Sequence, residues 1–135
     1  MFNSAFWQRL RGRPARTPAA RAPEAIRCVV LQEGLSSPST DYLLRPWLER
    51  LGLPQLIVDV RQGVPPDVPR HGDLVVVSRY LTSAWRRVLT ARRGRLAGLV
   101  YFMDDDLFDA AALRGLADGY ARKLRVFALD QRAWL

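Results

Sequence analysis

The sequence predicts an α/β domain with a Rossmann-like, doubly wound parallel sheet of about four strands in three layers. Four short runs rich in valine, leucine and isoleucine are apolar on both faces, as strands covered by helices on both sides must be. Helix-forming segments lie between these runs, and such alternation is typical of a parallel sheet. A chain of 135 residues, 49% hydrophobic and 25% charged, is long enough for one domain with its own core.

The first half of the chain carries two of these runs and one helix pattern. The four predicted strands are Ile26–Leu31, Leu56–Val60, Leu74–Val77 and Leu96–Met103. After the first run, apolar residues spaced i, i+3, i+4, i+7 predict a helix that buries Leu44, Trp47, Leu48 and Leu51. Pro46 fits the first turn of this helix and Gly52 is its stop signal. The segment Arg61–Gly72 contains three prolines and is expected to be a loop.

The second half of the chain predicts three more helices. Between the third and fourth strands, a helix has Thr82 or Ser83 as its cap, Gly94 as its end, and a stripe of Trp85, Val88 and Leu89. After the last strand, a short helix is expected over Asp109–Leu116. A longer one runs from Tyr120 to Gln131, with Tyr120, Leu124, Phe127 and Ala128 in register. The uncapped apolar end at Trp134 and Leu135 is expected to be exposed, and it suggests that the chain is part of a larger polypeptide.

The net charge of +8 is unevenly distributed. Residues 1–27 hold six arginines against the single acid Glu24, which gives this segment a charge of +5. We therefore divide the chain into a basic, flexible arm over 1–24 and a folded domain over 25–135. Two interpretations of the arm remain open: an anchor that inserts Phe6 and Trp7 into an anionic lipid surface, and a solvated tail.

Twenty arginines against one lysine indicate a bias in genomic base composition rather than phosphate binding. No recognition helix, zinc finger or aromatic RNA platform accompanies the charge, so no nucleic-acid partner is predicted. The single cysteine, Cys28, lies in an apolar run and is expected to be a buried structural thiol. The sequence predicts a cytoplasmic protein, and under the anchor interpretation its arm would make a peripheral contact with the inner membrane.

Polar side chains follow three of the predicted strands at their carboxyl ends, where open parallel sheets bind ligands. Folding is expected to bring these side chains to one rim. The residues predicted to bind substrate are Glu33, Gly34, Ser78, Arg79 and Tyr80. The residues predicted to be catalytic are Asp104, Asp105 and Asp106.

The acidic triplet at 104–106 has two open interpretations. Repulsion between adjacent carboxylates raises the pKa of one of them or recruits a cation, which favours a functional role. Alternatively, an aspartate of the triplet caps the helix that begins near Asp109. A metal site lacks an obvious third ligand beyond Asp109 or Glu33, so no metal is predicted.

Several enzyme classes are excluded by their missing motifs. A phosphatase of the haloacid dehalogenase type fails because Phe108 takes the Thr/Val position and the strand is the fourth, and a receiver domain fails on its acid pattern. No glycine-rich dinucleotide motif, P-loop or serine-nucleophile elbow occurs. His71 lies in a turn at the amino end of the third strand, away from the expected cleft, and is expected to be solvated.

Two segments, 73–80 (DLVVVSRY) and 98–107 (GLVYFMDDDL), with Trp85 between them, carry a family resemblance. They resemble the N-terminal half of bacterial glycosyltransferases of the GT-B fold, in the retaining family 1/4-like group. The resemblance covers about residues 26–135 and implies that Arg79, Tyr80 and Asp104–Asp106 line the acceptor side of an interdomain cleft. It also implies that the nucleotide-sugar is held by a second, C-terminal domain that this chain lacks, and that no catalytic metal or cofactor is needed.

The leading hypothesis from the sequence is therefore the acceptor-side half of a glycosyltransferase, inactive alone. The complete enzyme would move a sugar from a nucleotide-sugar to a glycan or lipid-linked acceptor, with the missing domain or a partner chain supplying the donor site. The alternative is a non-enzymatic α/β binding or docking domain whose apolar end, Trp134 and Leu135, meets another chain. A third reading is a metal-dependent hydrolase that uses Asp104 and Asp106.

Overall fold

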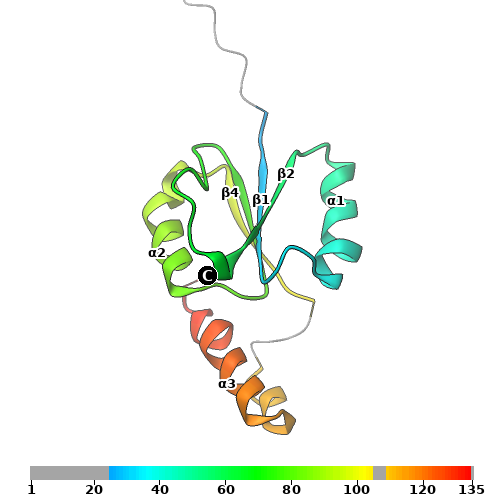
Figure 1. Cartoon of the computed structure of the whole chain (residues 1–135), viewed down its shortest axis with the longest axis vertical. Helices are drawn as coiled ribbons and strands as arrows, with labels where there is room; N and C mark the ends of the chain where they lie inside the picture. Colours follow the sequence, from blue (N-terminus) through cyan, green and yellow to red (C-terminus); the bar gives the residue numbers. More distant parts are fainter. Residues whose placement is uncertain (1–24, 105–108, 135) are drawn as a thin grey trace, which may run out of the picture.

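Four parallel strands form a central sheet in the computed structural model, which describes residues 25–104 and 109–134 (Figure 1). The strands are β1 (Cys28–Gln32), β2 (Gln55–Asp59), β3 (Leu74–Ser78) and β4 (Gly98–Phe102), in the order β2-β1-β3-β4. All three neighbouring pairs are parallel. The predicted Rossmann-like α/β fold is confirmed, and each predicted strand matches an observed one with its ends shifted by at most two residues.

The helices are α1 (Arg45–Arg50), α2 (Ser83–Arg92) and α3 (Asp118–Phe127). Thr82 is the N-cap of α2, as predicted, because its hydroxyl accepts from the Trp85 amide at 3.4 Å. Short 3-10 turns occur at Val60–Gln62, Arg93–Arg95, Ala112–Gly115 and Leu129–Gln131. The expected loop between β2 and β3 is present, and the expected short helix after β4 is the 3-10 turn at Ala112–Gly115.

Helices cover the sheet on both faces, which makes the fold doubly wound (Figure 1). Successive residues of a strand point to opposite faces, so β1 contributes Val29 and Leu31 to one core cluster and Cys28 and Val30 to the other. The first cluster also contains Trp85 and Leu89 of α2, and the second contains Leu44 and Leu48 at α1. Full burial of each such valine or leucine stabilises the fold by about 1.5–3 kcal/mol.

The apolar stripe predicted for the first helix is only half correct. Leu44 and Leu48 are buried, but Trp47 and Leu51 are each 51% exposed. The chain enters α1 through a π-helical turn, Thr40–Leu44, which inserts an extra residue into the turn and rotates the residues around it. The buried face of α1 is therefore narrower than an uninterrupted 3.6-residue period predicts.

Beyond the carboxyl ends of the strands, α3 packs against the rim and leaves both faces of the sheet to other elements (Figure 1). Leu124 and Ala128 contact Tyr80 and Met103, which follow β3 and β4. The helix ends at Phe127 rather than at Gln131, because Ala128 leaves the helical conformation. Gln131 then anchors the chain by donating a hydrogen bond to the Leu81 carbonyl.

The end of the described chain corrects one further prediction. Trp134 is packed against the α2 core cluster, and its indole N–H donates to the Thr90 hydroxyl at 2.8 Å. It is therefore no exposed docking end, while Leu135 and the arm over 1–24 lie outside the described residues. Within residues 25–104 and 109–134, no helix has both the length and the apolar character that crossing a membrane requires.

Candidate functional site

A cleft of about 410 Å³ opens at the carboxyl ends of β1 and β3. We call it the carboxyl-edge cleft. Its lining residues are Gln32, Glu33, Gly34, Ser36, Ser37, Pro38, Arg61, Ser78, Arg79 and Tyr80. All five residues predicted to bind substrate are among them, which places them together as the topology of a parallel sheet requires.

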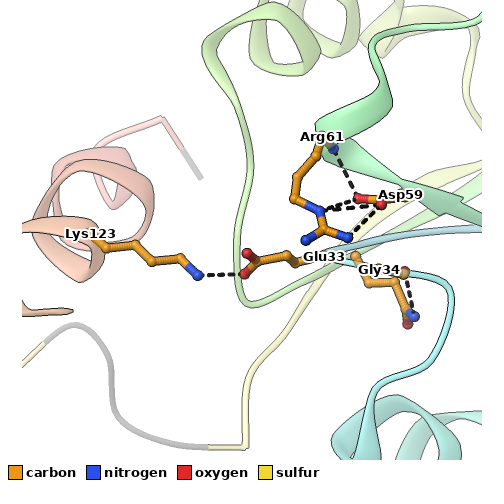
Figure 2. A network of polar contacts seen from close by, with 6 residues as sticks. Glu33, Gly34, Asp59, Arg61 and Lys123 are labelled. Carbon is orange, nitrogen blue, oxygen red and sulfur yellow. Dashed lines mark hydrogen bonds and ion pairs between the residues drawn. The ribbon is translucent and has the colours of Figure 1, made fainter. Parts of the chain in front are cut away.

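One wall of the carboxyl-edge cleft contains an ion pair between Asp59, the last residue of β2, and Arg61 (Figure 2). The Arg61 guanidinium donates to both oxygens of Asp59, with Nη2–Oδ2 at 2.8 Å, and the Arg61 amide donates to the same carboxylate at 3.0 Å. These bonds hold the pKa of the buried Asp59 well below its ordinary value and raise that of Arg61. Gly34 faces this pair with a φ of +80°, where a Cβ would lie 3.6 Å from the Arg61 guanidinium.

The end of β3 turns sharply at Arg79. Its φ is +66°, the one positive φ of a non-glycine residue in the described chain. The Tyr80 amide donates to the Ser78 carbonyl at 2.8 Å, so the turn is a γ-turn centred on Arg79. The Tyr101 hydroxyl donates to the Arg79 carbonyl and braces this turn from β4. Strained backbone of this kind is concentrated at functional sites.

Asp104 connects the ends of β4, β3 and the π-helical turn. Its carboxylate lies 3.3 Å from Arg79 Nε and accepts a hydrogen bond from the Ser39 hydroxyl. Both side chains of the Arg79–Asp104 pair are 22% exposed. Behind them, the Thr40 and Ser78 hydroxyls are 3.3 Å apart and buried. Asp104 therefore contacts Arg79 and Ser39 at the rim, whereas Asp105 and Asp106 lie outside the described residues.

A third ion pair ties α3 to the rim (Figure 2). Lys123 Nζ lies 2.6 Å from Glu33 Oε2 and 4.7 Å from the centre of the Tyr80 ring. The Arg79 guanidinium lies 5.7 Å from the same ring. Burial, and then a hydrogen bond with Tyr120, raise the pKa of the Tyr80 hydroxyl. Tyr80 therefore has a neutral hydroxyl, and two cations lie over its ring.

Gln32 supplies an unmet hydrogen-bond acceptor at the base of the carboxyl-edge cleft. It is 1% exposed, and its amide nitrogen donates to the Gly34 carbonyl at 2.9 Å. Its Oε1 is buried and has no hydrogen-bond partner within the described residues. Leaving such an atom unpaired costs about 1–3 kcal/mol, so a bound donor at this position would recover that free energy.

Sequence reasoning missed Asp59, Arg61 and Lys123, and it assigned no role to Gln32 and Ser39, which lie in the polar segment after the first predicted strand. Arg61 and Asp59 sit at a strand end like the predicted residues, so the carboxyl-end rule could have found them. Lys123 carried a different signal, because it is the single lysine of a chain with twenty arginines. Its position 90 residues from Glu33 left the pairing itself invisible in the sequence.

The other candidates from the sequence, a metal site, His71 and Cys28, do not contribute to this cleft. Among the described residues, no group of three or more His, Cys, Asp and Glu side chains could hold a metal ion. His71 lies at the amino end of β3, as predicted, and Cys28 is buried, with burial and the nearby Asp73 raising its pKa to about 11. A buried thiol with so high a pKa is no nucleophile at neutral pH.

Together, the fold and the cleft define a Rossmann-like parallel α/β domain with a polar cleft at the carboxyl edge of its sheet. Comparison with protein-family models, curated proteins and solved structures gave no match to this chain. The site itself must therefore carry the functional interpretation.

Proposed function

We propose that the carboxyl-edge cleft binds a hydroxyl-rich, uncharged ligand, and that this chain is the acceptor-side half of a glycosyltransferase. The complete enzyme would take its sugar from a nucleotide-sugar held by another domain or chain. The proposal rests first on Gln32, whose buried Oε1 has no hydrogen-bond partner in the described part of the chain and lies in a cleft otherwise lined by hydroxyl, amide and charged groups. Sugar hydroxyl groups are donors of the kind that this oxygen lacks.

The charges at the rim favour a neutral acceptor over an anionic donor. Each cation there already has a carboxylate: Arg61 with Asp59 at 2.8 Å, Arg79 with Asp104 at 3.3 Å, and Lys123 with Glu33 at 2.6 Å. A nucleotide-sugar brings two negatively charged phosphates, which bind best where cations or backbone amides are available to them. A rim with balanced charges suits a polyol that exchanges hydrogen bonds without adding charge.

In this proposal Asp104 positions an acceptor hydroxyl. Its carboxylate is already held by Arg79 and Ser39, so its orientation is fixed before a ligand arrives. A carboxylate can accept a proton from an attacking hydroxyl, and the adjacent guanidinium can offset developing negative charge. Asp105 and Asp106 would act beside it.

The proposal is tested by saturation-transfer NMR on the full chain with a panel of methyl glycosides and short oligosaccharides. At least one member is expected to bind, and Gln32→Met and Ser78→Ala are expected to weaken its binding at least tenfold. Arg87→Gln is the control, because Arg87 is exposed on α2 and does not line the cleft.

Two results would contradict the proposal. One is that no glycoside binds, or that the control weakens binding as much as Gln32→Met. The other is that UDP-glucose binds the chain more tightly than any uncharged sugar, which would make this the donor side.

One observation favours a second candidate function, a docking domain that pairs with another chain. The outer side of α1 and its preceding turn exposes four large side chains, Tyr42, Leu43, Trp47 and Leu51, which are 51–81% exposed. Exposed apolar patches of this kind mark interaction surfaces. Under this alternative the glycosides fail to bind, while Trp47→Lys abolishes an association that sedimentation detects for the wild-type chain.

A further inference from the structure

A second cleft lies at the opposite, amino edge of the sheet. Its volume is about 220 Å³, and we call it the amino-edge cleft. It lies where the loop before β3 meets the C-terminal end of α2, at the same end of the molecule as the start of β1 (Figure 1). The Gly72 amide donates to the Arg95 carbonyl at 2.8 Å and fixes these two segments against each other. The polar residues that line the amino-edge cleft are Asp67, Arg70, His71, Arg92 and Arg95.

Arg92 is held in place by neutral groups. Its Nη1 donates to the Pro69 carbonyl at 2.9 Å and its Nη2 to the Pro66 carbonyl at 3.1 Å. Within the described residues, Arg92 makes no ion pair. Its guanidinium is therefore oriented in advance, while its charge is not neutralised by a carboxylate.

The other two arginines of the cleft are also without a carboxylate partner. Within the described part of the chain, neither the Arg70 nor the Arg95 side chain makes an ion pair or a hydrogen bond. The neighbouring Asp73 is already occupied, by Arg27 at 2.6 Å and by the Arg70 amide at 2.7 Å. This is the opposite of the carboxyl edge, where each cation of the rim has its carboxylate.

The charge of the cleft matches a dianion. Three guanidinium groups against the single lining carboxylate, Asp67, leave a net charge of +2 with His71 neutral. A phosphate monoester carries about −1.5 to −2 at pH 7 and offers three acceptor oxygens. Guanidinium groups bind such oxygens in pairs of parallel hydrogen bonds. A carboxylate ligand would leave part of this positive charge uncompensated.

We propose that the amino-edge cleft binds a dianionic phosphate group through Arg70, Arg92 and Arg95. The phosphate belongs either to a small soluble ester or to a phospholipid headgroup. A second hollow of about 390 Å³ shares Arg70 and His71 with the cleft, and it has room for the rest of such a molecule. This site is independent of the carboxyl-edge cleft, so its test does not depend on sugar binding.

The experiment measures inorganic phosphate binding to the full chain by calorimetry. Arg70→Gln/Arg95→Gln is expected to weaken binding at least tenfold. The matched control, Arg86→Gln/Arg87→Gln, removes the same charge from an earlier turn of α2 and is expected to change affinity less than twofold. Arg70→Lys/Arg95→Lys retains the charge without the paired donors and is expected to fall between the two.

Flotation with vesicles separates the two sources of phosphate. If wild type and the matched control bind phosphatidic acid in phosphatidylcholine vesicles and the cleft variant does not, the ligand is a lipid headgroup. If phosphate binds and the cleft variant floats like wild type, the ligand is a soluble ester. The proposal is overturned if millimolar phosphate does not bind, or if both glutamine double variants weaken binding equally.

Discussion

Arg79 occupies a backbone conformation that an arginine disfavours, and this gives a quantitative prediction. Its φ of +66° lies in the left-handed region. That region costs an L-residue about 1–2 kcal/mol and costs glycine almost nothing. We predict that Arg79→Gly is more stable than Arg79→Ala. Both variants lose the guanidinium and its partly exposed ion pair with Asp104, so that loss cancels in the comparison.

The magnitude follows from two opposing effects. At a position with ordinary φ, alanine is more stable than glycine by about 0.4–1 kcal/mol, because it restricts the unfolded chain. Here the relief of the left-handed strain exceeds this entropy, so glycine is favoured by about 1 kcal/mol. In a chain of 135 residues that difference makes the melting temperature of the glycine variant higher by about 3–5 °C.

Urea unfolding and calorimetry of the two variants provide the assay. An alanine variant as stable as the glycine variant, or more so, would refute the strained γ-turn at Arg79. Both variants are expected to weaken glycoside binding to the same extent, because both remove the guanidinium that holds Asp104. If only one weakens it, the backbone rather than the side chain controls the cleft.

Three further predictions concern the core, the rim and the thiol. Leu48→Ala is expected to lower the free energy of unfolding in urea by about 2–5 kcal/mol, because Leu48 is fully buried. Trp47→Ala is expected to lower it by about 1 kcal/mol or less, because Trp47 is half-exposed. Equal losses would contradict the register of α1. Lys123→Met removes a partly exposed ion pair with Glu33 and is expected to lower the free energy of unfolding by less than about 1 kcal/mol at low salt and by still less at high salt. Hydrogen exchange in α3 is expected to accelerate. Cys28 has a pKa raised from 9.0 to about 11, so the unfolded chain releases its thiol proton first as pH rises. The free energy of unfolding is therefore expected to fall between pH 9 and 11, by less in Cys28→Ala than in wild type, and a pH-independent difference between the two would contradict the shift.

The fold could be predicted because the strands are locally encoded. Each strand is a short apolar run ended by polar residues, and the pattern needs no knowledge of distant contacts. Thr82 signalled the start of α2 through its own side chain in the same way. The register of α1 could not be predicted, because the π-helical turn at Thr40–Leu44 changes which residues face the core. Trp47 has the expected spacing and still lies half-exposed.

The candidate site was predictable only in part, for a similar reason. Glu33 and Ser78 could be placed together because the ends of parallel strands meet at one edge. Lys123 could not, because α3 packs across the rim through Tyr80 and Met103, and no local pattern specifies that contact. The unpaired Oε1 of Gln32 also has no signal in the sequence, because it depends on the absence of a hydrogen-bond donor around that atom among the described residues.

The cations at the two edges of the sheet differ in whether they pair with carboxylates. This difference allows the two proposals to be tested against each other. At the carboxyl edge, Arg61, Arg79 and Lys123 each pair with a carboxylate, so binding there is expected to depend little on salt. At the amino edge, the guanidinium groups that line the cleft have no carboxylate partner among the described residues, so binding of an anion is expected to weaken steeply as salt rises. A sugar whose binding is as salt-sensitive as that of phosphate would mean that both occupy the amino-edge cleft. If Arg70→Gln/Arg95→Gln leaves the affinity for phosphate unchanged and Arg79→Gln weakens it, the anion binds at the carboxyl edge. That result would reverse the assignment of donor and acceptor sides.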